Sequence, residues 1–255
     1  MKNTIRTFAI GDTHGHFKEL QDLLLTLKKE ANFDPKNDHL VLLGDMVDSG
    51  PQVKELLDWA IDFKKQYPDT FHPIYGNHED LLLDALSKYH PIYGDYYIWW
   101  NQGGKETIAS YMPDGLSDYE KALVHPENII PAEHFAFLRS LPRYYEDDKY
   151  FYVHGGVYPD KKLSEHDFED RPTMYNMIWI RDQFIDSPYK WEKKIIFGHS
   201  SKTAYIGAGE SDFVPIVQDN KIGINTMPRH NMGYLLALEL PAEKFYTEKG
   251  ERVYE

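Results

Sequence analysis

Six side chains of types that commonly bind divalent metals lie in five short loops spread along the chain. They are Asp12, His14, Asp45, Asn77, His154 and His199. Together they offer two carboxylates, one amide oxygen and three imidazoles. A carboxylate can bridge two cations, and imidazoles suit transition metals such as Mn, Fe and Zn. Two such metals about 3.5–4 Å apart can stabilise an in-line phosphoryl displacement and lower the pKa of a shared water.

Each of these loops follows a short apolar run that predicts a buried strand. The runs are 7–10, 40–43, 73–75, 150–153 and 195–197. Apolar residues at helical spacing predict helices between them, at about 20–29, 51–61 and 81–86. This alternation indicates an α/β fold, in which sites form at the carboxyl ends of the strands. We therefore expect the five loops to converge on one edge of the fold.

The regular alternation lapses between residues 89 and 142. We interpret this stretch as a largely helical insertion or cap within a single domain of 1–255. Aromatic residues gather at 93–100; they could stack nucleobases, but such clusters are more typical of the core of a cap. From 213 to 240, short apolar runs with Gly and Asn breaks predict antiparallel strands that close a second sheet.

Composition limits the classes of function. The 255 residues are 42% hydrophobic, which is enough for a substantial core. A formal charge of -13, from 28 basic and 41 acidic residues, argues against binding to nucleic acid or to an anionic membrane. No run approaches the roughly 20 apolar residues of a membrane helix, and no signal peptide is recognisable before Gly11. The absence of cysteine excludes disulfides and thiolate ligands and fits a cytoplasmic protein.

The loops also carry a set of short motifs in a fixed order. In this chain they read GDTHG, GDMVDSG, GNHE, HGG and GHS, between residues 11 and 200. In these motifs the chain resembles the calcineurin-like metallophosphoesterases, and within them the serine/threonine phosphoprotein phosphatase branch. That branch includes bacterial and phage lambda-type phosphatases and symmetrical diadenosine tetraphosphate hydrolases. WNQGGKET at 100–107, LPRYYED at 141–147 and IWIRDQF at 178–184 also resemble its bacterial members. The resemblance implies a β-sandwich of two mixed sheets flanked by helices.

The same resemblance implies a dinuclear metal site. The first metal would be bound by Asp12, His14 and Asp45. The second would share Asp45 as a bridging ligand and add three more side chains, Asn77, His154 and His199. The cofactors would be two divalent ions, with Mn as the first expectation and Fe, Zn or Ni as alternatives.

Residues for phosphoester hydrolysis are also implied by the motifs. His78 matches a catalytic histidine that would protonate the leaving oxygen as a general acid, with Asp48 as the carboxylate that orients it. A hydroxide bridging the two metals would attack the phosphorus from the opposite side. Arg181 matches an arginine that binds phosphate oxygens, and Asn77 would contact the same phosphate.

Two positions depart from the family pattern. Ser49 stands where the family has an arginine in its second motif, and Asn225 stands where relatives usually have aspartate. The first change removes one of two expected phosphate contacts, unless Arg143 or Arg229 supplies it.

The leading hypothesis is a metal-dependent phosphoric monoester hydrolase resembling bacterial serine/threonine protein phosphatases. Its substrate would be a phosphoprotein or a small phosphorylated molecule. A symmetrical bis(5'-nucleosyl)-tetraphosphate hydrolase is the nearest alternative, because it shares every metal motif. A metal-containing module that binds phosphate or phosphoprotein without turnover is another, suggested by Ser49 alone. The sequence leaves the oligomeric state open.

Overall fold

The apolar runs form strands because both of their faces are buried. In β1 (Thr7–Ile10), Phe8 and Ile10 belong to one hydrophobic cluster, whereas Ala9 belongs to another. The same alternation divides the side chains of β5 (Tyr150–Val153) between two clusters. Successive side chains of a strand point to opposite faces, so a run that is apolar throughout can be covered on both sides. β1 and β5 are accordingly interior strands of their sheets, whereas β3 (Phe71–Pro73) lies at an edge.

The computed structural model describes residues 5–87, 94–112, 117–201, 213–226, 233–252 and 254. Its strands form a six-stranded sheet of order β11-β10-β9-β1-β2-β3 and a five-stranded sheet of order β4-β5-β6-β8-β7. In the first sheet, the remaining strands are β2 (His39–Leu42), β3 (Phe71–Pro73), β9 (Ala237–Leu240), β10 (Lys244–Thr247) and β11 (Gly250–Arg252). In the second, they are β4 (Tyr144–Glu146), β6 (Lys194–Phe197), β7 (Ile216–Gln218) and β8 (Lys221–Gly223).

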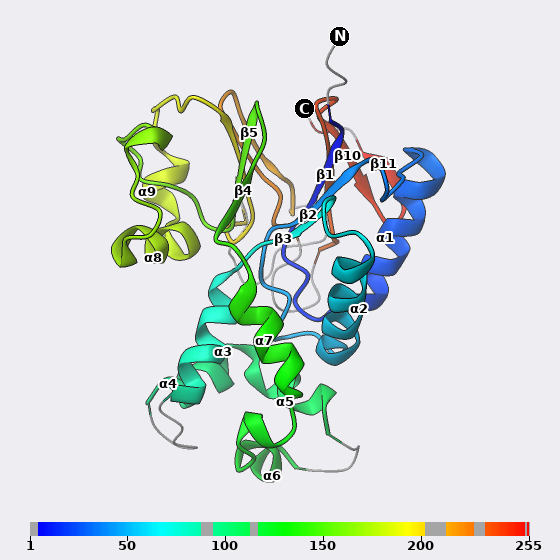
Figure 1. Cartoon of the computed structure of the whole chain (residues 1–255), viewed down its shortest axis with the longest axis vertical. Coiled ribbons are helices and arrows are strands. Elements are labelled where there is room, and N and C mark those ends of the chain that lie inside the picture. Colours follow the sequence, from blue (N-terminus) through cyan, green and yellow to red (C-terminus); the bar gives the residue numbers. More distant parts are fainter. Residues whose placement is uncertain are drawn as a thin grey trace.

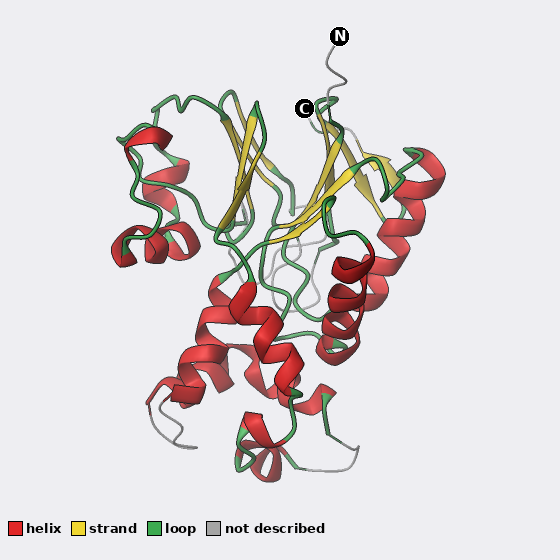
Figure 2. Ribbon diagram, in the orientation of Figure 1, coloured by secondary structure: helices red, strands yellow, loops and turns green. Residues whose placement is uncertain are grey.

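Parallel pairing occupies one end of the first sheet and the middle of the second. Strands β1, β2 and β3 are mutually parallel, as are β5, β6 and β8. The flanking strands β9, β10 and β11, and β4 and β7, pair in the antiparallel sense. The two sheets pack face to face, as Figure 2 shows, with helices on their outer faces. The predicted α/β sandwich of two mixed sheets is thereby confirmed.

Helices cover the outer face of each sheet (Figure 1). Beside the first sheet lie α1 (Phe17–Glu30) and α2 (Val53–Gln66), and beside the second lie α8 (Arg171–Trp179) and α9 (Asp182–Ile185). A short 3₁₀ turn, η3 (Leu163–Glu165), precedes α8. Helix α3 (Asn77–Ser87) begins at Asn77, earlier than expected, and α2 begins two residues after Pro51, where the sequence predicted its start.

The prediction for residues 213–240 is wrong in part. β7 and β8 do form an antiparallel pair in the second sheet. β8, however, pairs with β6 in parallel, and β9 joins the first sheet beside β1. The chain crosses from the second sheet to the first between β8 and β9. Neither strand has an alternation of apolar and polar residues that would indicate which sheet it joins.

The described residues between α3 and β4 are mainly helical. They form α4 (Gly94–Trp99), the wide turn η1 (Trp100–Gly104), α5 (Lys105–Ser110), α6 (Asp118–Ala122), η2 (Pro126–Asn128) and α7 (Ala132–Ser140). Tyr96 and Trp99 are fully buried, whereas Tyr97 is half exposed. The aromatic side chains Tyr96 and Trp99 therefore pack inside this segment and offer no exposed ring for a base; Tyr93 lies outside the described residues.

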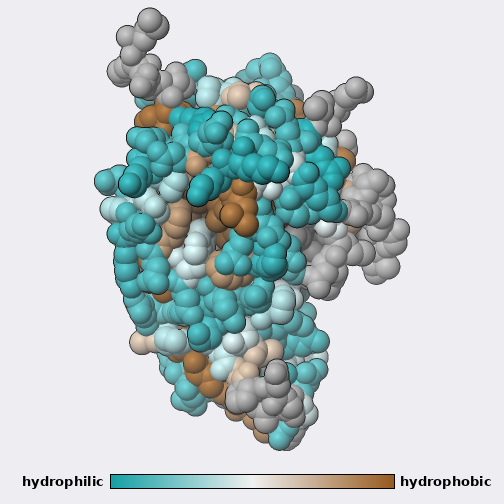
Figure 3. Space-filling view, turned by 90° about the vertical axis from the view of Figure 1, so that its right-hand side faces the viewer, coloured by the Kyte–Doolittle hydropathy of each residue, from teal (hydrophilic) through white to brown (hydrophobic). Residues whose placement is uncertain are grey.

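The face that carries α1 and α2 has an apolar hollow at its surface (Figure 3). Leu24, Leu25, Phe33 and Phe63 line it, and Leu25 is 64% exposed.

No helix among the described residues is both long and apolar enough to cross a lipid bilayer.

Candidate metal and phosphoester site

All five predicted loops lie at the carboxyl ends of parallel strands. β1, β2 and β3 lead into the loops of Asp12, Asp45 and Asn77, while β5 and β6 of the opposite sheet lead into those of His154 and His199. Carboxyl ends of parallel strands meet at one edge of a sheet. Because both sheets present that edge to the same side, the loops face one another across the sandwich. The predicted convergence is confirmed by the distances between their side chains.

Asp45 lies at the centre of the cluster. Its Oδ2 lies 3.3 Å from Nε2 of His154 and 3.6 Å from Nε2 of His14. Oδ1 of Asn77 lies 2.8 Å from the same Nε2 of His154. The six candidate ligands are at most 5% exposed. One carboxylate thus lies between ligands assigned to the two different metals.

Backbone carbonyls fix the orientation of two of the imidazoles. Nδ1 of His154 lies 2.6 Å from the carbonyl oxygen of Leu43, and Nδ1 of His14 lies 3.1 Å from that of Val47. A carbonyl can only accept, so each Nδ1 carries the proton. The Nε2 atoms therefore point at Asp45, from where each can bind a metal once it is unprotonated. Burial disfavours the charged form of His154, but the charges of Asp45 and Asp12 raise its pKa to about 9, so its Nε2 carries a proton that a metal would replace.

Asp12 is held by a residue that the motifs did not assign. Nδ2 of Asn225 donates to its Oδ2 at 2.6 Å, and the backbone N–H of His199 donates to both of its carboxylate oxygens at 3.0 and 3.1 Å. An aspartate at position 225 would place a second negative charge where this donor is needed. Asn225 is thus a compatible replacement for the aspartate usual in relatives.

The two buried carboxylates have pKa values shifted in opposite directions. Burial, together with the neighbouring charge of Asp45, raises the pKa of Asp12 to about 7. Burial also disfavours the ionised form of Asp45, but the fields of His154 and His78 hold its pKa well below the usual range. Burial, with the charges of His154 and Arg181, lowers the pKa of His199 and keeps it neutral. Neutral imidazoles and carboxylates are the protonation states that metal binding requires.

The donor set fits a pair of divalent cations. Ligand atoms of His14, Asp45 and His78 lie within 4.8 Å of one another, as do those of Asp45, His154 and His199. Nε2 of His199 is buried and has no hydrogen-bond partner among the described residues. A buried polar atom without a partner is costly unless something else satisfies it. Nitrogen and carboxylate donors in this combination suit Mn, Fe or Zn.

Left-handed backbone is concentrated in these loops. Among the described residues, seven non-glycine residues have positive φ, and five of them are in the site: His14, Asp45, Asp48, Ser49 and His199. Such conformations cost of order 1–3 kcal/mol each and persist where the surrounding structure enforces them. Asp45, at φ 52°, places its carboxylate 3.3 Å from Nε2 of His154, which follows a strand of the opposite sheet.

Glu79, the last residue of the GNHE motif, was given no role by the sequence. It is fully buried, and its Oε2 accepts from the backbone N–H groups of Asp45 and Gly76 at 2.9 and 2.8 Å. Its Oε1 accepts from those of Met46 and Val47 at 2.7 and 3.4 Å. Glu79 therefore holds the loop that carries Asp45 against the start of α3. The sequence feature that could have identified Glu79 is its position in the GNHE motif, where it is an acidic residue with no assigned role.

We expect Glu79→Gln to destabilise the protein by about 2–6 kcal/mol. The amide nitrogen of glutamine cannot accept, so two of the backbone N–H groups lose their partner, at about 1–3 kcal/mol each. Metal affinity should fall as well, because the Asp45 loop loses its support. Chemical denaturation and metal analysis would measure both effects. Glu55→Gln, on the exposed face of α2, is the control; equal stabilities of the two variants would contradict the role of Glu79.

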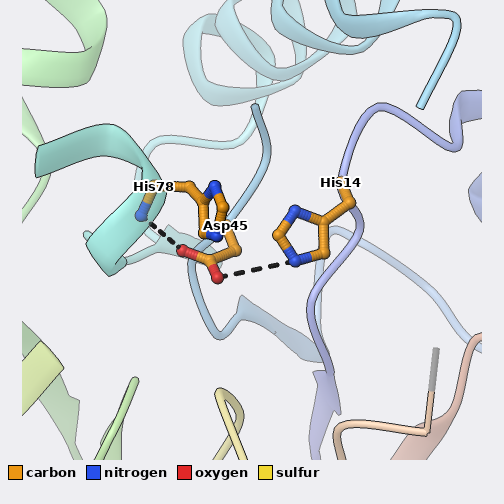
Figure 4. Close-up of side chains that lie close together, drawn as sticks. All are labelled: His14, Asp45 and His78. Carbon is orange, nitrogen blue, oxygen red and sulfur yellow. Dashed lines mark hydrogen bonds and ion pairs between the residues drawn. The ribbon is translucent and has the colours of Figure 1, made fainter. Parts of the chain in front are cut away.

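His78 and Asp48 form a buried pair beside the candidate ligands. Nδ1 of His78 lies 2.7 Å from Oδ2 of Asp48, and the ring centroids of His78 and His14 are 4.8 Å apart. The backbone N–H of His78 donates to Oδ1 of Asp45 at 2.9 Å (Figure 4). The other oxygen of Asp48 accepts from Nε1 of Trp99 and from Oγ1 of Thr107. The motifs predicted the pairing of His78 with Asp48 but not the contacts of Asp48 with Trp99 and Thr107.

Arg181 lies beside His199. Its Nη1 donates to the backbone oxygen of His199 at 2.9 Å. The position follows from α8, whose last turn packs on the loop after β5: the N–H of Gly155 donates to the carbonyl of Met177 at 2.6 Å. Arg143 is the alternative partner for phosphate. Its guanidinium carbon lies 3.6 Å from the ring centroid of Tyr75, and its Nη1 lies 3.9 Å from Oδ1 of Asp80. Arg229 lies outside the described residues.

Comparison with curated proteins finds relatives of two kinds. The chain is 26% identical over 202 residues to serine/threonine-protein phosphatase 2 of Salmonella typhimurium, covering 75% of this chain and 78% of the relative. It is 26% identical over 197 residues to the symmetrical bis(5'-nucleosyl)-tetraphosphatase of Photorhabdus laumondii, covering 74% of this chain. The chain spans only 60% of that second relative.

Solved structures share the fold at low sequence identity. A putative diadenosine tetraphosphatase superposes with a TM-score of 0.57 at 18% identity, covering 96% of this chain and 94% of the other. A cold-active protein-tyrosine phosphatase of Shewanella gives 0.57 at 19% identity, with coverages of 99% and 81%. The family model of the calcineurin-like phosphoesterases matches residues 5–224, which include every loop of the site. The chain is a member of the calcineurin-like phosphoesterase family.

Proposed function

We propose that this protein is a dinuclear, metal-dependent phosphoric monoester hydrolase of the serine/threonine protein phosphatase type. The observation that carries the proposal is the buried His78–Asp48 pair, 2.7 Å apart, next to the cluster around Asp45. A site that only binds phosphate has no need of a proton donor. The pair therefore favours turnover over the binding-module alternative.

Six residues would hold the metals in this proposal. Asp12, His14 and Asp45 would bind the first ion, and Asp45, Asn77, His154 and His199 the second. When bound, the two ions supply Lewis acidity, which neutralises phosphate charge and lowers the pKa of a nearby water. Manganese is the first metal to test.

The remaining residues act on the substrate. His78 would donate a proton from its ring to the leaving oxygen, with Asp48 holding the ring and stabilising its protonated form. Arg181, beside His199, would bind phosphate oxygens through its planar guanidinium, and Asn77 would contact the same group. We further propose that residues 1–255 act as one domain, in which the helices between α3 and β4 form a cap.

A second candidate is supported by the comparisons. Several relatives, among them the protein of Photorhabdus laumondii, are named symmetrical bis(5'-nucleosyl)-tetraphosphatases. Asp48 in GDMVDSGP favours the protein-phosphatase type, because symmetrical tetraphosphatases tend to have asparagine at the corresponding position of this motif. The two candidates share the proposed metal site and differ in substrate.

Parallel assays of metal-stripped protein, with and without Mn²⁺, would separate the candidates. The substrates are p-nitrophenyl phosphate, a phosphoserine peptide and diadenosine tetraphosphate. We expect Mn²⁺-dependent release from the first two and little from the third. Preference for the dinucleotide would transfer the proposal to the second candidate. No turnover by protein that holds two metals would overturn both.

Ser49→Arg is expected to raise kcat/KM for phosphomonoesters by about 10-fold. Ser49 is only partly buried and adjoins Asp48, so an arginine there can extend toward a bound phosphate and add a charge-assisted hydrogen bond worth about 1.5–3 kcal/mol. Steady-state kinetics with p-nitrophenyl phosphate would measure the change, with Ser49→Gln as a control of similar reach without charge. Unchanged or lower kcat/KM would mean that Arg143 or Arg229 already fills the role.

A further inference from the structure

We propose that Trp99 and Thr107, in the helical segment between α3 and β4, are positioning residues for proton transfer by His78. They hold the carboxylate oxygen of Asp48 that does not face His78, and Asp48 holds His78 through the other. This inference rests on the proposed function, because it assumes that His78 donates the proton. It assigns a task to a segment that contributes none of the candidate metal ligands.

Four hydrogen bonds converge on Asp48. Oδ1 accepts from Nε1 of Trp99 at 2.9 Å and from Oγ1 of Thr107 at 2.7 Å, while Oδ2 lies 2.7 Å from Nδ1 of His78. The backbone N–H of Asp48 donates back to Oγ1 of Thr107 at 2.9 Å. Asp48, Trp99 and Thr107 are completely buried. The Thr107 hydroxyl thus acts as donor to the side chain and acceptor from the backbone of one residue.

This pattern fixes the rotation of the carboxylate. A buried carboxylate with one partner could turn about its χ2 bond, which is a soft torsion. Two donors on Oδ1 leave Oδ2 as the oxygen directed at His78. They also favour the ionised form, although burial still leaves the pKa of Asp48 raised. A carboxylate held in one rotation orients the imidazole.

The segment is shaped so that both donors reach Asp48. Trp99 ends α4 and Thr107 lies in α5, and the chain kinks between them at Gly103, which has non-helical φ 111° and ψ 2° within η1. The backbone oxygen of Gly103 accepts from the N–H of Ser49 at 3.0 Å, so the turn is docked on the residue after Asp48.

Two glycines make this close approach possible. Gly103 has φ +111°, and a Cβ there would lie 2.5 Å from Oγ of Ser49. A Cβ on Gly104 would lie 2.4 Å from Cε2 of Trp99. Any side chain at either position would displace the indole or lift the turn from Asp48. The sequence WNQGGKET therefore encodes a contact with the His78–Asp48 pair, not only the core of a cap.

A positioning role has a signature that a purely structural role lacks. Proton donation matters most when the leaving group is a strong base and least when it leaves readily. Misplacing His78 should therefore slow hydrolysis of phenyl phosphate, whose phenolate is a poor leaving group, far more than hydrolysis of p-nitrophenyl phosphate. A general loss of structure or of metal would slow both substrates by the same factor.

Two variants of the full, metal-loaded chain test the proposal: Trp99→Phe and Thr107→Val. We expect kcat for phenyl phosphate to fall about 10- to 100-fold and kcat for p-nitrophenyl phosphate to fall less than about threefold. The first factor is less than the roughly 10²–10⁴-fold attributed to general acid catalysis as a whole, because His78 is misplaced and not removed. KM should change little for either substrate. Metal content and thermal midpoint, measured on the same samples, show whether the variants are folded and loaded.

Matched controls come from the same segment. Thr107→Ser keeps the hydroxyl and should keep the leaving-group dependence of the wild type. Tyr96→Phe alters a buried aromatic residue of α4 whose hydroxyl donates to the carbonyl of Val124, away from Asp48. Because Thr107→Val preserves shape, it remains informative if Trp99→Phe fails to fold.

The outcomes separate this inference from the proposed function. If the wild type hydrolyses none of the phosphomonoesters, the proposed function fails first. If the wild type is active and Thr107→Val slows both substrates equally, or slows neither, the proposed function survives and the positioning role is wrong. A steeper leaving-group dependence in Thr107→Val, restored in Thr107→Ser, supports it.

Discussion

Replacement of Asp45 by asparagine is expected to abolish turnover and metal retention together. The carboxylate lies 3.3 Å from Nε2 of His154 and 3.6 Å from Nε2 of His14, and its Oδ1 accepts the backbone N–H of His78. An amide has one acceptor oxygen, which cannot serve two cations and His78 at once, and it carries no charge. We expect kcat to fall at least about 10³-fold, as for the loss of one member of a cooperating catalytic set.

Metal analysis distinguishes this role from a purely catalytic one. The wild type should retain two metal ions per chain after desalting and Asp45→Asn one or none. Asp22→Asn, which alters an exposed carboxylate paired with Lys18, serves as the control and should retain both. Full occupancy by two ions in an inactive Asp45→Asn protein would show that Asp45 does not bridge them.

The strands and loops of the site were predictable because their signals are local. β1 and β5 match the expected runs 7–10 and 150–153 residue for residue, since a strand buried on both faces must be apolar throughout. The motif residues follow directly after such runs, so their convergence followed from the behaviour of parallel sheets. Local patterns thus fixed the positions of Asp12, Asp45 and His154.

Contacts between distant segments were not predictable in this way. Asn225 reaches Asp12 across 213 positions, and Thr107 reaches Asp48 across 59. Asn225 stands out as a departure from the family pattern and Thr107 belongs to WNQGGKET, but neither pattern indicates which residue each of them contacts. β9 illustrates the same limit at the level of the fold, because its sequence does not say which of two sheets it joins. Such pairings depend on the complete tertiary structure.

Backbone strain at the site was equally absent from the sequence pattern. His14, Asp45 and His199 adopt positive φ, although none is glycine. Hydrogen bonds between loops that are distant in sequence hold these conformations. The N–H of His14, for example, donates to the backbone carbonyl of Asp45 at 2.7 Å. Residues held this way are pre-oriented, which favours metal binding because little ordering remains to be done.

The second large effect is expected for His78→Asn, which should lower kcat by about 10²–10⁴-fold while both metals stay bound. Loss of the proton donor removes general acid catalysis, and the deficit should be greatest for phenyl phosphate and the phosphoserine peptide. Metal retention is expected because His78 contacts Asp45 through its backbone N–H, at 2.9 Å, and any residue at this position can donate that bond. Parallel kinetics and metal analysis provide the measurement.

The contrary result would reassign His78. Its ring lies within 4.8 Å of ligand atoms of His14 and Asp45, a spacing that a metal ligand could also have. If His78→Asn lost one metal ion as readily as Asp45→Asn, the imidazole would be a ligand and not the proton donor. Its 2.7 Å contact with Asp48 would then orient a metal ligand, and the effects of Trp99 and Thr107 would appear in metal affinity instead of leaving-group dependence. Because Nδ1 of His78 already faces Asp48, only Nε2 remains for either task, so the ring cannot perform both at once.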